Sequence, residues 1–245
     1  ISTLKKRGYI NDLDISSSKE EIIKIIDDYD GLILRSRFKI DKYFIDNASN
    51  LKFIARVGSG LENIDCNYAK SKNIEVISSP EGNSNAVGDH AMGLLLSLLN
   101  NINTSSNQVK NGLWFREKNR GFEIEGKTVA ILGMGNTGKS FAKKISSFNC
   151  KVVFYDINEK IESKYAKKTS LDFLYKNADI VSLHLPFTTT TTDLFNKEFI
   201  QKFDKPFWLI NTSRGKIVNT PDLVDALNEK KILGAGLDVI DIESS

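Results

Sequence analysis

A glycine-rich turn that directly follows an apolar run constrains this chain more than any other feature. The run Val129–Leu132 contains two β-branched residues and leads into glycines at positions 133, 135 and 138. In a strand–turn–helix unit, Gly133 makes the tight turn, Gly135 lets a pyrophosphate approach the backbone, and Gly138 packs the helix against the strand. A helix that begins there offers unpaired N–H groups and the positive end of its dipole to phosphates. The segment therefore predicts a strand, a phosphate-binding turn and a helix.

A second strand and an acidic residue complete the unit. Apolar residues at helical spacing follow the turn, and the run Val152–Tyr155 then ends on Asp156, 18 residues after Gly138. A carboxylate near this spacing binds the ribose hydroxyls of a dinucleotide and repels a 2′-phosphate, which favours NAD over NADP. The alternative is a glycine-rich turn in another kind of α/β protein. The cofactor contacts predicted from this unit are Gly133, Gly135, Asn136, Thr137, Gly138 and Asp156.

Composition argues against several classes of partner. The 245 residues carry a net charge of +3, and their charges are interspersed, so nothing demands a nucleic acid or an acidic membrane surface. The two cysteines, Cys66 and Cys150, lack metal-ligand spacing and are expected to be reduced thiols. No apolar run reaches the roughly 18 residues of a membrane span. We expect a cytoplasmic protein that binds no metal, nucleic acid or membrane.

Residues 1–80 predict a small α/β layer of their own. Short apolar runs alternate with amphipathic segments, which is typical of a parallel sheet. The expected strands are 31–34, 52–57 and 74–77, and the expected helices are 20–28 and 42–47. Ligands of such sheets bind beyond the carboxyl ends of the strands. Arg35 and Arg56 stand at two of these ends, so they are either parts of an anion site or ordinary surface charges.

Residues 81–245 predict the cofactor domain, which a long helix over residues 84–100 introduces. This helix is apolar on most sides, so we expect it to be buried between domains or subunits. His90 lies on it and is expected to be a packed, hydrogen-bonded residue rather than a catalyst. Thr220 followed by Pro221 predicts the capped start of a later helix. Further strands are expected at 179–183, 207–210 and 234–239.

Four segments resemble the signature segments of the D-isomer-specific 2-hydroxyacid dehydrogenases. They are 56–65, 133–138, 211–215 and 234–239, with Glu62 where that family usually has aspartate. Within the family, D-3-phosphoglycerate dehydrogenases are the most similar branch, through segments 34–36, 80–84 and 114–116. The resemblance implies a Rossmann-type, doubly wound parallel sheet for the cofactor domain and a smaller flavodoxin-like α/β substrate domain. It also implies a homodimer formed through the cofactor domains.

A reaction and roles for individual residues also follow from the resemblance. A hydride passes between C2 of a D-2-hydroxy acid and the nicotinamide of NAD, with 3-phosphoglycerate of serine biosynthesis the favoured substrate. Arg214 holds the substrate carboxylate and carbonyl, a His–Glu pair moves the hydroxyl proton, and Asp238 binds the nicotinamide carboxamide. Glu243 lies 29 residues after Arg214, in the register of that glutamate. The aromatic residue and proline that usually surround the glutamate are missing from residues 239–245.

Two alternatives to a phosphoglycerate dehydrogenase stay open. A glyoxylate or hydroxypyruvate reductase of the same fold acts on a substrate without phosphate and would not need three arginines. An NAD-sensing co-repressor is less favoured, because no segment resembles a peptide-docking extension. The substrate contacts implied by the family are Arg35, Ser36, Arg56, Gly58, Ser59, Gly60 and Arg116. Its further cofactor contacts are His184, Pro186, Thr212, Ser213 and Asp238.

The small number of histidines limits the choice of acid–base group. Only His90 and His184 are present, and neither has a glutamate at a spacing that suggests a pair. In the family the catalytic histidine follows the glutamate, so we expect it beyond Ser245, and we expect the first strand of the substrate domain before Ile1. We therefore expect domains incomplete at both chain ends, NAD binding with impaired turnover, and a two-fold dimer with Arg116 near the neighbouring subunit's cleft.

Overall fold

The described chain forms two compact units. The structure, a computed structural model, describes residues 2–241. Its units are Ile1–Pro80 and Glu81–Ser245, called unit 1 and unit 2 below. Each unit has its own parallel sheet and its own hydrophobic core, and each is described by itself.

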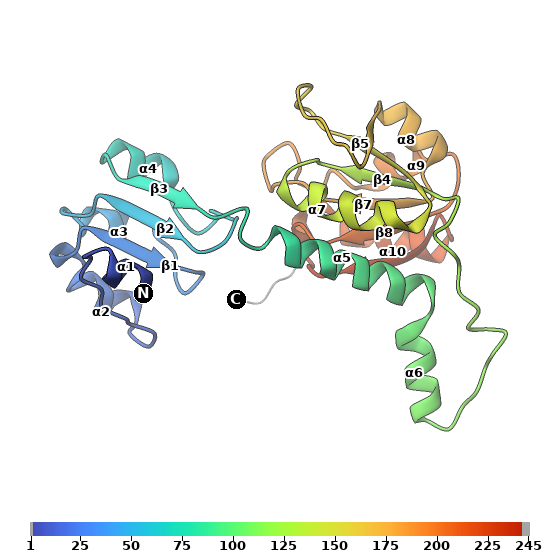
Figure 1. Cartoon of the computed structure of the whole chain (residues 1–245), viewed down its shortest axis with the longest axis horizontal. Helices are drawn as coiled ribbons and strands as arrows, with labels where there is room; N and C mark the ends of the chain where they lie inside the picture. The colour runs from blue at the N-terminus through green and yellow to red at the C-terminus, as the bar shows by residue number, and fades with distance from the viewer. Residues whose placement is uncertain (1, 242–245) are drawn as a thin grey trace. The chain divides into compact units, whose positions relative to one another are not determined.

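Unit 1 is a three-stranded parallel sheet with short helices, drawn in blue to cyan in Figure 1. Its elements are α1 (Ser2–Lys6), α2 (Lys19–Ile23), a 3-10 turn (Ile26–Asp28), β1 (Gly31–Leu34), α3 (Lys42–Asp46), β2 (Phe53–Arg56), α4 (Cys66–Ser71) and β3 (Glu75–Ser78). The strands lie in the order β1-β2-β3, which confirms the three predicted strands. Leu34 lies opposite Arg56, and Arg56 lies opposite Ser78. The three strands therefore end at one edge of the sheet.

The single helix predicted over residues 20–28 is wrong in extent. The chain instead forms α2, which starts with a capping box between Ser18 and Glu21, and then the separate 3-10 turn. Ile22 and Ile26 both lie in the core of unit 1, whereas Ile25 is exposed. Residues four apart share one face of a helix, so the buried face agrees with the predicted pattern although the helix itself is interrupted.

Unit 2 is a doubly wound sheet, as predicted. Its elements are α5 (Ser84–Leu99), α6 (Ile102–Lys110), β4 (Thr128–Leu132), α7 (Asn136–Ile145), a 3-10 turn (Ser146–Phe148), β5 (Lys151–Tyr155), β6 (Lys167–Lys168), α8 (Leu171–Asn177), β7 (Ile180–Leu183), α9 (Lys197–Gln201), β8 (Phe207–Asn211), a 3-10 turn (Gly215–Ile217), α10 (Thr220–Asn228) and β9 (Ile232–Leu237). The strand order is β6-β5-β4-β7-β8-β9, and all neighbours are parallel. The chain thus builds outward from β4 in both directions. The reversal between β4 and β7 is the point at which such sheets bind ligands.

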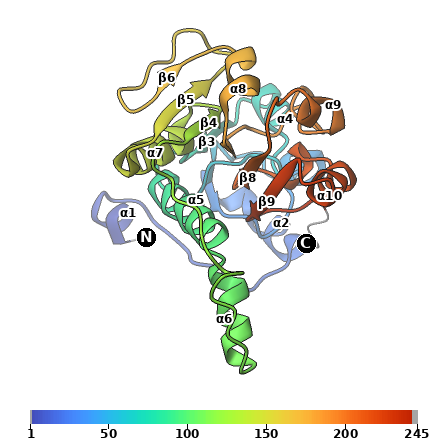
Figure 2. The same ribbon diagram turned by 90° about the vertical axis from the view of Figure 1, so that its right-hand side faces the viewer.

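Buried side chains of the strands alternate between the two faces of this sheet. Val129 and Ile131 of β4 belong to the core beneath α5 and α7, whereas Ala130 and Leu132 belong to the core beneath α8, α9 and α10. Figures 1 and 2 show helices on both faces. Because both faces are covered, the strands read as nearly continuous apolar runs in the sequence.

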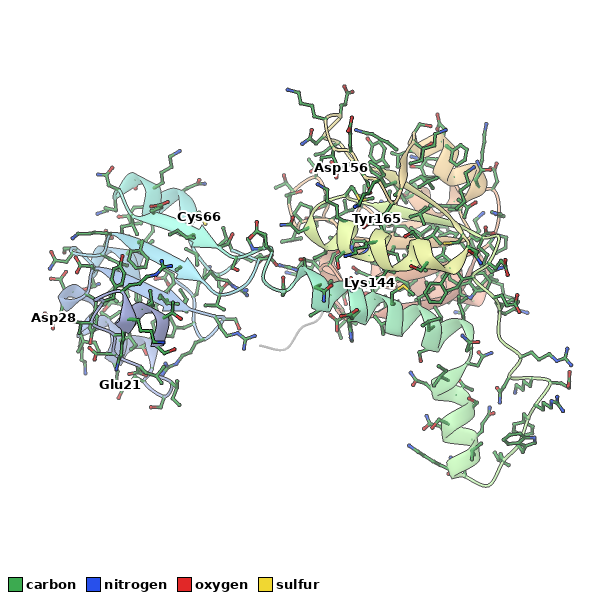
Figure 3. The ribbon with its side chains drawn as sticks, in the orientation of Figure 1. Glu21, Asp28, Cys66, Lys144, Asp156 and Tyr165 are labelled. Atoms are coloured by element: carbon green, nitrogen blue, oxygen red, sulfur yellow. The ribbon has the colours of Figure 1, made fainter. Side chains whose placement is uncertain are left out.

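The apolar helix α5 is covered on one side by unit 2 itself. The buried residues of α5 are Gly88, Ala91, Met92, Leu95 and Leu99. Gly88 allows a close approach to α7, since a Cβ there would lie 2.4 Å from Ser140 Oγ. Lys144 of α7, labelled in Figure 3, lies 2.9 Å from Asp89 of α5 and ties the two helices together.

Helix α6 and the segment that follows it project from the rest of unit 2 (Figures 1 and 2). Their apolar side chains are correspondingly exposed, with Trp114 77% exposed and Ile102, Val109 and Phe115 also open to solvent. Within residues 2–241, no helix combines the length and apolar character needed to span a bilayer.

The predicted cap of the helix α10 is wrong by one residue. The N-cap is Asn219, whose side chain accepts a hydrogen bond from the Asp222 N–H, and Thr220 is the first helical residue. Asparagine is the stronger N-cap of the two residue types, which favours the earlier start.

Candidate cofactor and substrate sites

The glycine-rich turn lies at the reversal point of the sheet in unit 2. Gly133 adopts a φ of +91°, and a Cβ on it would lie 2.4 Å from the carbonyl oxygen of His184 at the end of β7. A Cβ on Gly138 would lie 2.2 Å from the carbonyl oxygen of Gly133. Both contacts are with backbone atoms that cannot move aside, so the fold itself requires glycine at both positions.

Gly135 has a different reason to be glycine. Its φ of −73° suits any residue, and a Cβ there would meet nothing within 4 Å. Gly135 is the N-cap of α7, whose first N–H groups donate no hydrogen bond to a capping side chain within residues 2–241. Asn136 is exposed and Thr137 half-buried at the same helix end. An open face with uncapped N–H groups suits a pyrophosphate.

Asp156 lies beside this turn at the end of β5, where Figure 3 labels it. Its Oδ2 accepts a hydrogen bond of 2.7 Å from the Met134 N–H, and its Oδ1 accepts one of 2.8 Å from the Asn158 N–H. The carboxylate is therefore held at a fixed place next to the phosphate-binding turn. This is the place where the sequence predicted a ribose-binding acid.

The side chain of His184 lies beneath the turn rather than on its open face. The ring is 7% exposed and stacks on Phe141 of α7. Its Nε2 lies 2.8 Å from Ser182 Oγ, and its Nδ1 lies 3.3 Å from Thr137 Oγ1. Burial lowers the pKa of His184 from 6.5 to about 4, so the ring is neutral at physiological pH. The His184 side chain therefore supports the start of α7.

The loop after β8 presents Arg214, and neighbouring polar groups fix its main chain. Asn211 donates from its side chain to the Arg214 carbonyl at 3.0 Å and accepts from the Ser213 N–H at 3.0 Å. Ser213 Oγ donates to the Leu183 carbonyl at 2.6 Å and accepts from the Leu185 N–H at 3.1 Å. The Ser213 hydroxyl is thus engaged within the protein and ties the ends of β7 and β8 together.

Two other predicted residues of unit 2, Thr212 and Pro186, occupy different environments. Thr212 Oγ1 is buried and has no hydrogen-bond partner among residues 2–241, which leaves it available to a ligand. Pro186 is exposed after β7, and its carbonyl accepts a 2.7 Å hydrogen bond from Thr191 Oγ1. Glu243 lies outside the described residues.

His90 is placed differently from the prediction. It is 53% exposed rather than packed, and its Nε2 lies 3.0 Å from Oδ1 of Asp238, which follows β9. The sequence showed no glutamate at a spacing that suggests a pair with His90. His90 and Asp238 are far apart in the sequence and come together only because α5 packs on β9, so the pair becomes visible only in the structure.

In unit 1, Arg35 and Arg56 lie at the ends of the neighbouring strands β1 and β2. The guanidinium of Arg56 lies against Gly58, where φ is +139° and a Cβ would meet Nη1 at 1.5 Å. Arg56 Nη1 donates to the Val57 carbonyl at 3.2 Å, but its Nε is buried and has no partner within residues 2–241. Arg35 is exposed. A buried, unpaired cationic donor beside a second arginine suits an anion.

The other predicted substrate contacts belong partly to unit 1 and partly to unit 2. Ser36 and Ser59 are exposed near the same edge of unit 1, and Gly60 is buried. Arg116 is exposed in the projecting segment of unit 2. The described part of the chain contains no cluster of three or more metal-ligating side chains.

The buried ring of His184 predicts a pH dependence of stability. Its folded pKa of about 4 lies below the value of 6.5 expected in the unfolded chain, so the unfolded state binds a proton first as the pH falls. Stability should be lost between pH 6.5 and 4 by up to about 1.4 kcal/mol per pH unit. Denaturant titrations at pH 6.5 and pH 4 give the free energy of unfolding at each pH. We expect the decrease between the two pH values to be smaller for His184→Gln than for the wild type. Equal losses would contradict the assignment.

Alanine substitutions at Gly138 and Gly135 separate the structural role of the turn from its predicted role in phosphate binding. Gly138→Ala should lower the unfolding midpoint, because its Cβ meets the Gly133 carbonyl. Gly135→Ala should leave that midpoint within error but weaken NADH binding at least tenfold, because its Cβ enters the open face that the phosphates need. Fluorescence titration with NADH and thermal melts measure the two effects. Wild-type NADH affinity in Gly135→Ala would exclude the turn as the phosphate site.

Comparisons with known proteins agree with this geometry. The family model described as "D-isomer specific 2-hydroxyacid dehydrogenase, NAD binding domain" matches residues 92–245. A hydroxypyruvate reductase from Thermotoga maritima is 35% identical over 95% of this chain and 77% of its own length. A D-3-phosphoglycerate dehydrogenase from Archaeoglobus fulgidus is 33% identical over 99% of this chain but only 47% of its own length.

A solved structure gives the same picture. The NAD-dependent formate dehydrogenase from Staphylococcus aureus, in complex with NAD, matches with a TM-score of 0.82 and 31% identity, over 99% of this chain and 74% of the other. The chain therefore belongs to the D-isomer-specific 2-hydroxyacid dehydrogenases, and residues 92–245 are the NAD-binding domain of that family.

Proposed function

We propose that this protein oxidises a D-2-hydroxy acid with NAD, and that its substrate is 3-phosphoglycerate. The observation that carries the substrate assignment is the Arg56 guanidinium, which is seated on Gly58 with a buried, unpaired Nε beside Arg35. Two cationic side chains at one edge of a sheet suit an anionic group of a substrate, such as a phosphate or a carboxylate. The phosphoglycerate dehydrogenase among the relatives supports the same choice.

The residues of unit 2 suit NAD on three counts. The open face of Gly135 and the N–H groups of α7 would hold the pyrophosphate, and Asp156 would accept hydrogen bonds from the adenosine ribose. Thr212 Oγ1 is buried without a partner in the described chain and would contact the nicotinamide half. NAD, when bound, supplies the hydride acceptor.

Arg214 would orient the substrate in this reaction. Its guanidinium would hold the substrate carboxylate and the C2 oxygen in a charge-assisted fork, and it would stabilise negative charge that develops on that oxygen. The acid–base pair would accept the proton of the C2 hydroxyl as this oxygen becomes the carbonyl of the 2-oxo acid, and bound NAD would supply the hydride acceptor. Asn211 and Ser213 fix the loop that presents Arg214. Glu243 is proposed as the carboxylate of the acid–base pair.

A glyoxylate or hydroxypyruvate reductase is the second candidate. The relative from Thermotoga maritima, a hydroxypyruvate reductase, supports it directly. Such a substrate has one carboxylate and no phosphate. Its carboxylate would bind Arg214, and no second anionic group would remain to bind Arg35 and Arg56 at the edge of unit 1.

We also propose that the protein forms a two-fold homodimer. The projecting helix α6 and the segment after it expose Ile102, Val109 and Trp114, an apolar surface that a second copy would cover. Arg116 lies in this segment and is exposed, so it would reach the substrate cleft of the neighbouring subunit. Sedimentation that shows a monomer at micromolar concentration would count against this assembly.

Arg116→Ala separates the two candidate substrates. Loss of a charged hydrogen bond to an anion costs about 1.5–3 kcal/mol, so KM for 3-phosphoglycerate should rise at least tenfold. KM for glycerate, which lacks the phosphate, should change little. NADH formation with each substrate is the assay, and Lys118→Ala, a loss of positive charge in the same exposed segment, is the matched control.

Two results would contradict the proposal. If Arg116→Ala impairs both substrates alike, the phosphate assignment is wrong. If the wild type turns over glyoxylate or hydroxypyruvate with NADH but shows no activity on 3-phosphoglycerate, the reductase reading replaces it.

A further inference from the structure

Helix α5 lies across strand β9 in a fixed register. His90, Leu94 and Leu98 recur every fourth residue and so form one row on the helix, whereas Gly234, Gly236 and Asp238 alternate along the strand and its extension and so share one face of the sheet. A Cβ on Gly234 would lie 2.8 Å from Leu98 Cδ1, and one on Gly236 would lie 3.2 Å from Leu94 Cβ. One turn further along the helix and two residues further along the strand, the same alignment brings His90 next to Asp238.

The two glycines explain why a helix residue can reach the end of the strand. Without side chains at Gly234 and Gly236, α5 packs directly on the backbone of β9. Ala91, next to His90, is completely buried, so the helix cannot rotate without opening the core. At the other side, the Asp238 N–H donates to the Asn211 carbonyl at 3.0 Å and extends the ladder between β8 and β9. Packing therefore fixes both main chains.

The polarity of the contact between His90 and Asp238 follows from the groups involved. His90 Nε2 lies 3.0 Å from Asp238 Oδ1, and because an ionised carboxylate only accepts hydrogen bonds, His90 is the donor side of this contact. The contact occupies one oxygen of the carboxylate and restricts the rotation of its side chain. Asp238 remains 47% exposed, so its second oxygen, Oδ2, can serve a ligand.

Asp238 stands at the ligand-binding edge of the sheet, far from the adenosine end of the site. All six strands of unit 2 are parallel, so β9 ends at the same edge as β4 and β5. Four strand spacings separate β5, which carries Asp156, from β9, or about 19 Å. A dinucleotide extended from a ribose on Asp156 would bring its nicotinamide to the β8 and β9 end of this edge.

We infer that His90 is a positioning residue for the nicotinamide. It holds one oxygen of Asp238 so that the other accepts the N–H of the carboxamide. The inference rests on the proposed function, in which Asp238 receives that group. His90 does not touch the cofactor and takes no part in proton transfer.

The test compares NADH with ADP-ribose, which lacks the nicotinamide. Both ligands are titrated into the 245-residue chain by calorimetry, for the wild type, His90→Ala, His90→Gln and Asp89→Asn. Asp89→Asn is the matched control, because it alters the neighbouring residue, whose partner is Lys144 of α7. His90→Ala should weaken NADH binding about 3- to 10-fold and leave ADP-ribose binding within about 2-fold of the wild type.

The glutamine variant separates positioning from packing. The side-chain amide of His90→Gln can donate to Asp238, so this variant should recover most of the NADH affinity lost in His90→Ala. Asp89→Asn should bind both ligands as the wild type does. Thermal midpoints of all variants, measured on the same samples, report any loss of folded protein.

Several results would overturn the inference. His90→Ala could weaken both ligands equally, or weaken neither, and either result would show that His90 does not act through the nicotinamide end. Equal wild-type affinity for NADH and ADP-ribose would show that Asp238 contributes nothing. A wild-type chain that binds neither ligand would instead contradict the proposed function itself, and the inference with it.

Discussion

The backbone contact between Gly133 and the His184 carbonyl is the constraint on which the rest of unit 2 depends. The close approach occurs between β4 and β7, where the order in which the chain adds parallel strands to the sheet reverses. It leaves no room for a side chain, and Gly138 then presses against the Gly133 carbonyl, so the start of α7 is fixed relative to the sheet. A helix end that cannot move is a preorganised anion site, because its N–H groups need no rearrangement to meet a phosphate.

Buried polar contacts extend this rigidity along the ligand-binding edge. His184 connects Ser182 with Thr137, and Ser213 connects the ends of β7 and β8. These groups are neutral and hydrogen-bonded, so their burial costs little free energy of folding. The exposed ends of the same strands then present the charged residues, Asp156 and Asp238. The buried polar residues thus hold the strand ends in place, and the exposed charged residues at the same edge are free to contact a ligand.

Much of this architecture could be predicted from the sequence, because buried parallel strands are continuous apolar runs and the glycine spacing is specific. Local details were less visible: one predicted helix is divided into α2 and a 3-10 turn, and Asn219 rather than Thr220 is the cap of α10. The pairing of His90 with Asp238 could not be predicted, because it depends on the register of α5 against β9. The contact of the His184 ring with Thr137 was not visible either, since sequence position does not tell which side of a turn a side chain occupies.

The central claim is that unit 2 is built for NAD, with the adenosine ribose on the carboxylate of Asp156. The most direct measurement is the affinity of the wild type and of Asp156→Ala for NADH and for NADPH. We expect the wild type to prefer NADH at least tenfold. Hydrogen bonds from the ribose hydroxyls to a carboxylate contribute about 1.5–3 kcal/mol, whereas the same carboxylate repels a 2′-phosphate. Asp156→Ala should lose most of that preference. Equal affinity of the wild type for both cofactors would contradict the account.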